Sequence, residues 1–295
     1  MKNNKLKGGI LITLGAGCYG MLGTYVKLAY QEGFNTAEVT IAQFSLGFFG
    51  LFMLTLFRRT KPAGNRGGSV KSKMRLVLAG SSLGLTSIFY YLSVKYIAVS
   101  VAIVLLTQSV WMGVVVEAII QKKSPGIGKL LAVLIILSGT ILATNVLEQS
   151  ISFNWKGVLF GILGALCYTA TLFSTNHLEN HLPPLKRSLF MILGGLLVIL
   201  IVFHKNINSG FSCNIFFSWG LVVTLFGTIL PPLLFTRGMP LAGIGLGAIL
   251  ASIEIPIAVI MADALLNEQV VVGQWIGVAL ILGAVIWMNI PKRKQ

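Results

Sequence analysis

One acidic residue stands inside a long apolar stretch, where a charge is costly. Glu254 lies in the run ASIEIPIAVIM (251–261), two residues before Pro256. Because a charge at membrane depth costs about 2.5–3.5 kcal/mol on insertion scales, such groups face protein or a watery cavity. Pro256 lacks a backbone N–H and frees a carbonyl group nearby, which suits a hinge. We therefore expect Glu254 to bind a substrate ammonium group or a coupling proton, with a structural pair inside the bundle as the alternative.

Aromatic and amide side chains in other apolar segments could complete such a site. Tyrosine and tryptophan present ring faces to a cation and polar groups to an organic solute. A glutamine at this depth can contact a ligand or hydrogen-bond between helices. Helix packing is the alternative for each aromatic residue. The predicted substrate-binding or coupling residues are Glu254, Tyr19, Tyr90, Tyr91, Gln108, Trp111 and Tyr168.

Two further features concern bending and charge pairing. Pro231 and Pro232 interrupt an apolar segment and predict a kink, which serves either as a hinge that widens a cavity or as a fixed bend. Glu117 lies toward the end of another apolar segment, and we expect it to form a surface ion pair with Lys122 or Lys123, with a functional role as the alternative.

The sequence contains neither the zinc-protease motif nor the nucleotide-binding loop of ATP-driven pumps. HExxH and P-loop patterns are missing from the sequence, so zinc proteases and ATP-driven pumps have no support. We expect no catalytic residue, no metal and no cofactor, and any transport would be driven by a gradient. Cys18 and Cys167 fall inside apolar segments, where a buried, unreactive thiol is expected.

The elements that must position these residues are membrane helices. Of 295 residues, 55% are hydrophobic and only 11% are charged, against roughly 25% charged in an ordinary soluble protein. Several apolar runs have the length that a helix needs to cross a bilayer. The sequence predicts an all-α membrane protein whose ten helices lie near residues 8–30, 36–57, 74–95, 97–120, 127–146, 156–176, 186–204, 214–236, 240–263 and 271–290.

The basic residues indicate how these helices are oriented. If ten helices alternate in direction, all but four of the 23 lysines and arginines fall on the side of the N-terminus. The positive-inside rule then places both termini in the cytoplasm, with the chain in the inner membrane. The net charge of +15 is thus a topology signal with attraction to anionic lipid heads, and it indicates no nucleic-acid partner. The four exceptions are Lys27, Lys95, Lys156 and Lys205.

A repeated motif divides the chain into two halves. KGGILITLGAGCY (7–19) aligns with KGVLFGILGALCY (156–168) with 7 identities in 13 positions. We expect five-helix repeats over residues 1–149 and 150–295. Because five is odd, the second repeat must enter the membrane inverted, as in many secondary transporters. Tyr19 and Tyr168 are then expected at related places in the two halves.

At this point the chain resembles a known group. FYYLSVKYIAVSVAIVLL (89–106) and ASIEIPIAVIMADALLNEQVVVGQWIGVALILGAVI (251–286) are similar to the drug/metabolite transporter superfamily, in particular its ten-helix EamA-like members. The chain departs from that pattern at Gln108, where a proline is frequent, and at Gln43, where an arginine is frequent. The resemblance implies a basket of ten helices around a central cavity, with helices 5 and 10 at the periphery.

The resemblance and the repeat together predict a secondary transporter that works by alternating access. Its expected partners are a small organic solute such as an amino-acid-like metabolite, a coupling proton or cation, and membrane lipids; a homodimer is left open. Export is the expected direction and uptake is the alternative. A membrane-embedded enzyme, a lipid-handling protein and a passive channel also remain as alternatives.

Overall fold

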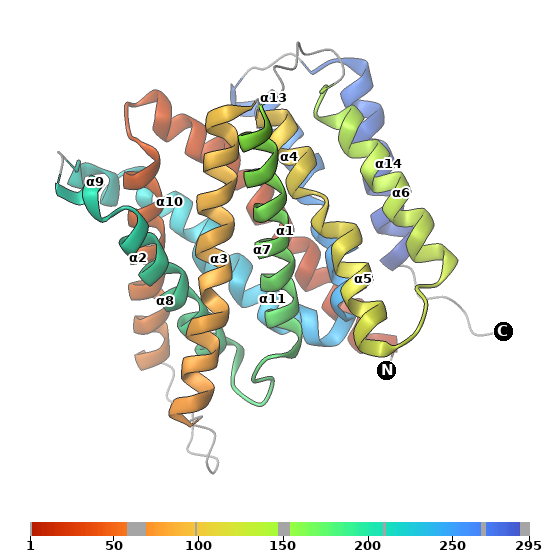
Figure 1. Cartoon of the computed structure of the whole chain (residues 1–295), viewed down its shortest axis with the longest axis horizontal. Helices are drawn as coiled ribbons and strands as arrows, with labels where there is room; N and C mark the ends of the chain where they lie inside the picture. Colours follow the sequence, from red (N-terminus) through yellow and green to blue (C-terminus); the bar gives the residue numbers. More distant parts are fainter. Residues whose placement is uncertain are drawn as a thin grey trace.

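Every regular element in the described part of the chain is a helix, and the predicted fold class is confirmed (Figure 1). Eight of these helices are long and apolar enough to cross a membrane, and the helices Ile127–Ala143 and Val272–Met288 are shorter but apolar. The predicted repeat boundary at 149/150 lies outside the described residues. The computed structural model describes residues 2–57, 69–97, 99–146, 154–208, 211–266 and 270–289.

The ten predicted spans reappear, but the fourth, eighth and ninth are interrupted. The first half contains α1 (Lys2–Gln31), α2 (Thr36–Phe57), α3 (Val70–Tyr96), α4 (Val99–Leu106) followed by α5 (Ser109–Gln121), and α6 (Ile127–Ala143). The second half contains α7 (Trp155–His177), α8 (Pro184–Val202), α10 (Trp219–Thr224), the π-helical η2 (Leu225–Ile229), α11 (Leu230–Ala242), α12 (Ile244–Ala251), α13 (Glu254–Leu266) and α14 (Val272–Asn289).

The structure differs from the predicted spans at two connections. The connection between the seventh and eighth predicted spans (186–204 and 214–236) contains the short helix α9 (His204–Asn208), and the 3₁₀ helix η1 (Cys213–Phe216) follows it. The eighth span runs to Ala242 rather than to residue 236, and Gly243 alone separates it from α12. Gly243 has φ +90°, a backbone conformation that glycine adopts without strain, so one residue suffices to reverse the chain.

The main contacts between the two halves recur when each helix is replaced by its counterpart in the other half. Helix α1 packs along α11, and its counterpart α7 packs along α3; likewise α3 packs along α8, and α10 along α2. Helices α2 and α8, and likewise α6 and α14, pair with their own counterparts, and α5 of the fourth span packs against α12 of the ninth span. Helices α6 and α14 lie together at one edge of the bundle (Figure 1), as the resemblance implies for helices 5 and 10.

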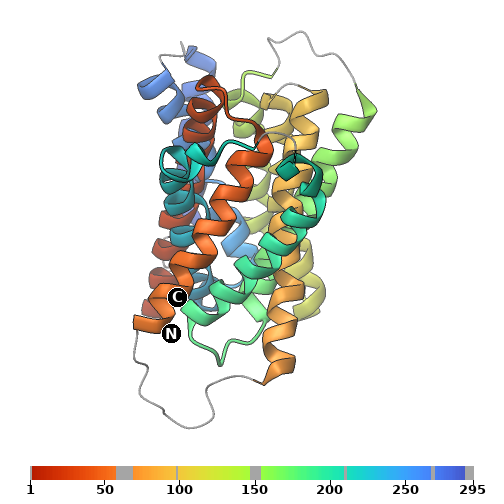
Figure 2. The same cartoon turned by 90° about the vertical axis from the view of Figure 1, so that its left-hand side faces the viewer.

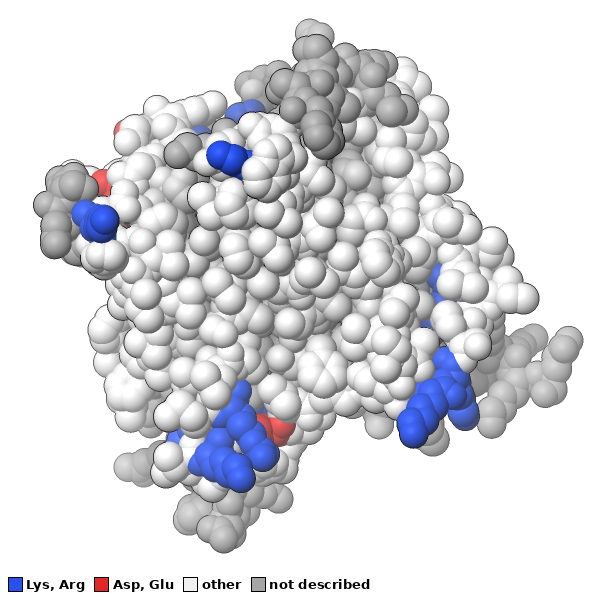
Figure 3. Space-filling model, viewed as in Figure 1, with Lys and Arg blue, Asp and Glu red and all other residues white. Residues whose placement is uncertain are grey.

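Basic side chains gather at one end of the bundle. In Figure 2 the first residues of α1 lie at the lower end of the molecule, and we call this end the N-terminal end. Figure 3 shows the larger groups of lysine and arginine at the same lower edge, over the start of α3 and the turn between α5 and α6. Those segments contain Lys71, Lys73, Arg75, Lys122 and Lys123. The distribution agrees with the charge asymmetry predicted from the sequence.

Candidate functional site

Two spans of the bundle are broken at corresponding positions. The fourth span breaks between Leu106 and Ser109, and the ninth between Ala251 and Glu254. An offset of 144, which aligns the later parts of the two halves, places Gln108 opposite Ser252. Interrupted helices at matching positions of inverted repeats are where transporters build their binding sites, because unwound backbone can then face a ligand.

The break in the ninth span follows from Pro256. A proline at this position cannot donate to the carbonyl of Ser252, one turn earlier. Instead the Ile255 N–H donates to that carbonyl at 3.1 Å, a tighter 3₁₀-type bond. The Ser252 hydroxyl also donates to the Ile249 carbonyl at 2.7 Å. The helix therefore restarts at Glu254, with the acidic side chain in its first turn.

The break in the fourth span has no proline and comes from a side chain. The Gln108 N–H donates to the Leu105 carbonyl at 3.1 Å, and its side-chain amide donates to the Val104 carbonyl at 3.0 Å. The side chain thus takes the acceptor that the backbone of an uninterrupted helix would use. The Trp111 indole N–H donates to the Gln108 side-chain oxygen at 2.9 Å, which holds the amide in place.

Three tyrosines from three helices lie in the neighbourhood of Glu254. The Tyr168 hydroxyl, on α7, donates to a Glu254 carboxylate oxygen at 3.5 Å. Tyr19 on α1 and Tyr90 on α3 lie close enough to interact with Glu254 electrostatically. Tyr168 is buried, whereas Glu254, Tyr19 and Tyr90 each keep part of their surface exposed. The group lies near the middle of α1 and α7, at a depth where a carboxylate and phenol rings can receive an organic cation or a proton.

Helix α1 passes close to the broken ninth span at small residues. A Cβ atom at Gly20 would collide with the Glu254 carbonyl oxygen, and one at Gly17 would lie 3.0 Å from the Ile257 Cδ1 atom. Glycine at these positions lets the two backbones approach, as small residues do between membrane helices. The repeated motif therefore brings Tyr19, next to Gly20, near the glutamate that Tyr168 contacts.

The other predicted site residues lie elsewhere. The Tyr91 ring centroid is 5.8 Å from that of Tyr90, and Tyr91 packs against a separate apolar cluster that includes Val26 and Val39. Gln108 and Trp111 are joined to each other, and Trp111 is 39% exposed. No described hydrogen bond links either of them to Glu254.

Both predicted proline hinges coincide with irregular helix. Pro231 and Pro232 are buried and directly follow the π-helical turn η2, in which the Leu230 N–H donates to the Leu225 carbonyl. Two consecutive residues without an N–H leave carbonyls of the preceding turn free, which favours the wider turn. The hydroxyl of Thr228, in that turn, donates to the Gln43 carbonyl of α2 at 2.9 Å.

The expectation for Glu117 was wrong. Glu117 is buried, and its ion-pair partner is Lys129 of α6, whereas Lys122 and Lys123 are exposed. The turn after α5 brings Ile127–Ala143 back along the bundle, and Lys129 lies on its first turn. The ion pair therefore joins two helices of the first repeat.

Two buried charged residues escaped the sequence analysis. Glu38, 4% exposed, accepts the Asn35 N–H at 2.8 Å and the Ser212 N–H at 2.7 Å. The spacing Asn35-x-x-Glu38 is a capping-box pattern and would have indicated the first of these bonds. Arg187, 1% exposed, lies in the first turn of α8. Nothing in its local sequence distinguishes it from the exposed basic residues of the same end.

No group of three histidine, cysteine, aspartate or glutamate side chains in the described part of the chain is placed to hold a metal ion. The residues near Glu254 themselves provide a carboxylate, phenol hydroxyl groups and aromatic ring faces.

Comparisons with known proteins agree with this architecture. A family model described as the EamA-like transporter family matches the chain twice, over residues 6–145 and 155–290. No curated protein matches the chain. Among solved structures 29 chains match; one, described as "Crystal structure of protein", is 15% identical with a TM-score of 0.72, over 93% of this chain and 95% of that one. At such identity the likeness establishes the fold alone.

Proposed function

The chain belongs to the EamA-like transporter family, and on that premise we propose that it exports a small organic metabolite by alternating access between its two inverted repeats. The expected solute is amino-acid-like. Such a solute carries an ammonium group that the Glu254 carboxylate can pair with, and tyrosine rings can cover its organic part. Uptake of the same class of solute is the alternative direction.

The observation that carries the proposal is the meeting of Glu254 with two tyrosines related by the repeat. Tyr19 and Tyr168 approach this carboxylate from opposite halves of the chain. A solute bound there touches both repeats at once, so a rocking motion of one repeat against the other changes its access from one side to the other. Glu254 stands directly after the helix break, where the backbone has freedom to rearrange.

A coupling role for Glu254 follows from the same geometry. A carboxylate that lacks an ion-pair partner among the described residues is stabilised either by a bound cation or by a proton. Competition between proton and solute ammonium at one carboxylate would couple export to proton entry. No nucleotide-binding motif occurs in the chain, so a gradient is the energy source that we propose.

The test is counterflow of labelled amino acids in proteoliposomes, run with and without a pH gradient. Glu254→Gln keeps the shape of the side chain and removes the charge, and we expect counterflow to fall at least about 100-fold, as loss of a buried charge contact worth about 3 kcal/mol implies. Tyr168→Phe removes one long hydrogen bond and should lower counterflow by less than about tenfold.

Asp263→Asn is the matched control, because Asp263 is an exposed carboxylate further along the same helix, α13. Transport by this variant should equal that of the unmodified protein. Full counterflow by Glu254→Gln would rule out an ionic role for this residue.

A further inference from the structure

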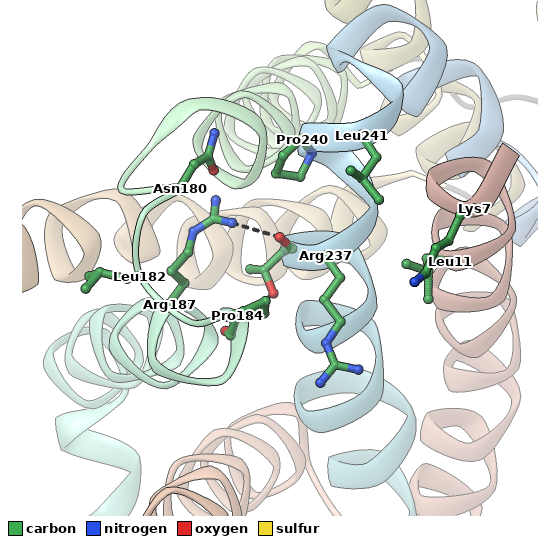
Figure 4. Close-up of a pocket in the computed structure, with 10 residues that line it drawn as sticks. Lys7, Leu11, Asn180, Leu182, Pro184, Arg187, Arg237, Pro240 and Leu241 are labelled. Atoms are coloured by element: carbon green, nitrogen blue, oxygen red, sulfur yellow. Dashed lines mark hydrogen bonds between the residues drawn. The ribbon is translucent and has the colours of Figure 1, made fainter. Parts of the chain in front are cut away.

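A pocket at the N-terminal end of the bundle lies away from Glu254. It has a volume of about 420 Å³ and opens between the start of α1, the turn from α7 to α8, and the last turns of α11 (Figure 4). This volume is within the range of small-molecule sites, about 300–1,000 Å³. The lining residues are Lys7, Leu11, Asn180, Leu182, Pro184, Arg187, Thr236, Arg237, Pro240 and Leu241.

The pocket carries three cationic side chains and none of its lining residues is acidic. Figure 4 shows Lys7, Arg187 and Arg237 coming from three different helices around it. Lys7 and Arg237 are exposed, so each can turn toward a ligand at little cost. Three cations without a lining carboxylate favour an anion with several oxygen atoms.

Arg187 is the buried member of this group and is incompletely paired. Its Nη1 donates to the Thr236 carbonyl at 2.7 Å and its Nη2 to the Thr175 carbonyl at 2.6 Å. Its Nε has no hydrogen-bond partner, although the residue is only 1% exposed. Two neutral carbonyl groups do not neutralise a buried guanidinium, which therefore attracts an anion to the adjacent pocket.

The nearby acidic residue is already engaged. Glu179, in the turn between α7 and α8, interacts electrostatically with Arg187. Its two carboxylate oxygens also lie 3.5 Å from Arg75 and 3.5 Å from His181. One carboxylate thus faces two arginines, and the cationic excess at the pocket remains.

We propose that this pocket binds the phosphate group of an anionic ligand, supplied either by an anionic phospholipid or by a free phosphate ester. Lysine and arginine recognise phosphate oxygens as charged donors. The leucines and prolines beside them can accommodate a glycerol unit and the first acyl carbons of a lipid. Basic pockets between membrane helices on the side of positive charge are typical binding sites for lipid head groups.

The site connects the two repeats. Lys7 belongs to α1, whereas Arg187 and Arg237 belong to α8 and α11 of the second half. A bound phosphate would hold these helices together at the N-terminal end. The proposal does not depend on the solute or on the role of Glu254, so failure of either leaves the other standing.

The experiment measures the melting temperature of the purified protein in detergent, with phosphatidylglycerol, phosphatidylcholine or glycerol 3-phosphate added. Each exposed cation contributes about 1 kcal/mol to binding of an anionic head group, so Lys7→Gln with Arg237→Gln should weaken the apparent affinity about 30-fold. Lys7→Gln alone should weaken it about fivefold. The control is Lys122→Gln with Lys123→Gln, which removes the same charge from exposed positions outside the pocket.

Stabilisation by phosphatidylglycerol, lost in the pocket variants and kept in the control, supports a lipid as the ligand. Stabilisation by glycerol 3-phosphate with the same pattern supports a free phosphate ester. The proposal is overturned if neither compound stabilises the protein, if phosphatidylcholine acts as well as phosphatidylglycerol, or if the control variant loses as much as the pocket variants.

Discussion

Gly20 is where α1 meets the backbone of Glu254, so a methyl group there tests the packing of the proposed site directly. In Gly20→Ala the new Cβ would collide with the Glu254 carbonyl oxygen and would lie 2.9 Å from the Ile257 Cβ. The first obstacle is backbone and cannot rotate away. Helix α1 must therefore shift away from α13.

The size of the effect follows from this geometry. Overpacking of this kind costs about 1–3 kcal/mol. Alanine is also a better helix former than glycine by about 0.5–1 kcal/mol, which partly offsets that cost. Gly23→Ala separates the two effects. Gly23 lies on the same helix, α1, and a Cβ atom added there has no neighbour within 4 Å, so this variant gains helix propensity without overpacking. The difference between the two variants should therefore equal the overpacking cost alone.

Thermal unfolding in detergent measures this difference. We expect Gly20→Ala to melt about 2–12 °C below Gly23→Ala, since about 1 kcal/mol shifts the melting temperature by about 2–4 °C in chains of about 150–250 residues. Counterflow by Gly20→Ala should fall as well, because the shift moves Tyr19 away from Glu254. Equal melting temperatures for the two variants would refute the close approach of α1 to the broken span.

Two further predictions concern the ends of the bundle. Glu38→Gln weakens two charge-assisted bonds, to Asn35 and Ser212, and should cost about 1–3 kcal/mol in thermal unfolding; Glu32→Gln, at an exposed position, should stay within about 0.5 kcal/mol. The distribution of basic residues predicts that a fluorescent reporter fused after residue 295 lies in the cytoplasm; a reporter accessible only from outside the cell would reverse the proposed orientation.

The spans themselves could be predicted because their signal is local. A bilayer requires about 20 apolar residues per helix, and that length can be counted along the chain. Pro256 likewise indicates irregular backbone before α13, because its missing N–H leaves the carbonyl one turn earlier without its helical hydrogen bond. The break at Gln108 was not predicted. A glutamine side chain competes with the backbone N–H for a helix carbonyl only when its surroundings hold it in place, and here the Trp111 indole N–H does so by donating to the Gln108 side-chain oxygen.

The candidate site was only partly predictable. Glu254 and the tyrosines were recognised by residue type and by the repeat, but their convergence depends on how α1, α3 and α7 pack around α13. Tyr91 has the same residue type and lies beside Tyr90, yet it packs against another cluster. One step along a helix turns a side chain by about 100°, so the neighbour of a site residue faces elsewhere.

The sequence by itself determined the ten apolar spans, the excess of positive charge at one end and the repeat, because each can be recognised from short segments of the chain or from a comparison of two such segments. Only the tertiary structure decided which charges are buried. Arg187 and Lys186 are adjacent basic residues, yet only the first reaches the carbonyls of α7 and α11. Burial of a charge depends on contacts with helices more than ten residues away along the chain. The local sequence does not indicate these contacts.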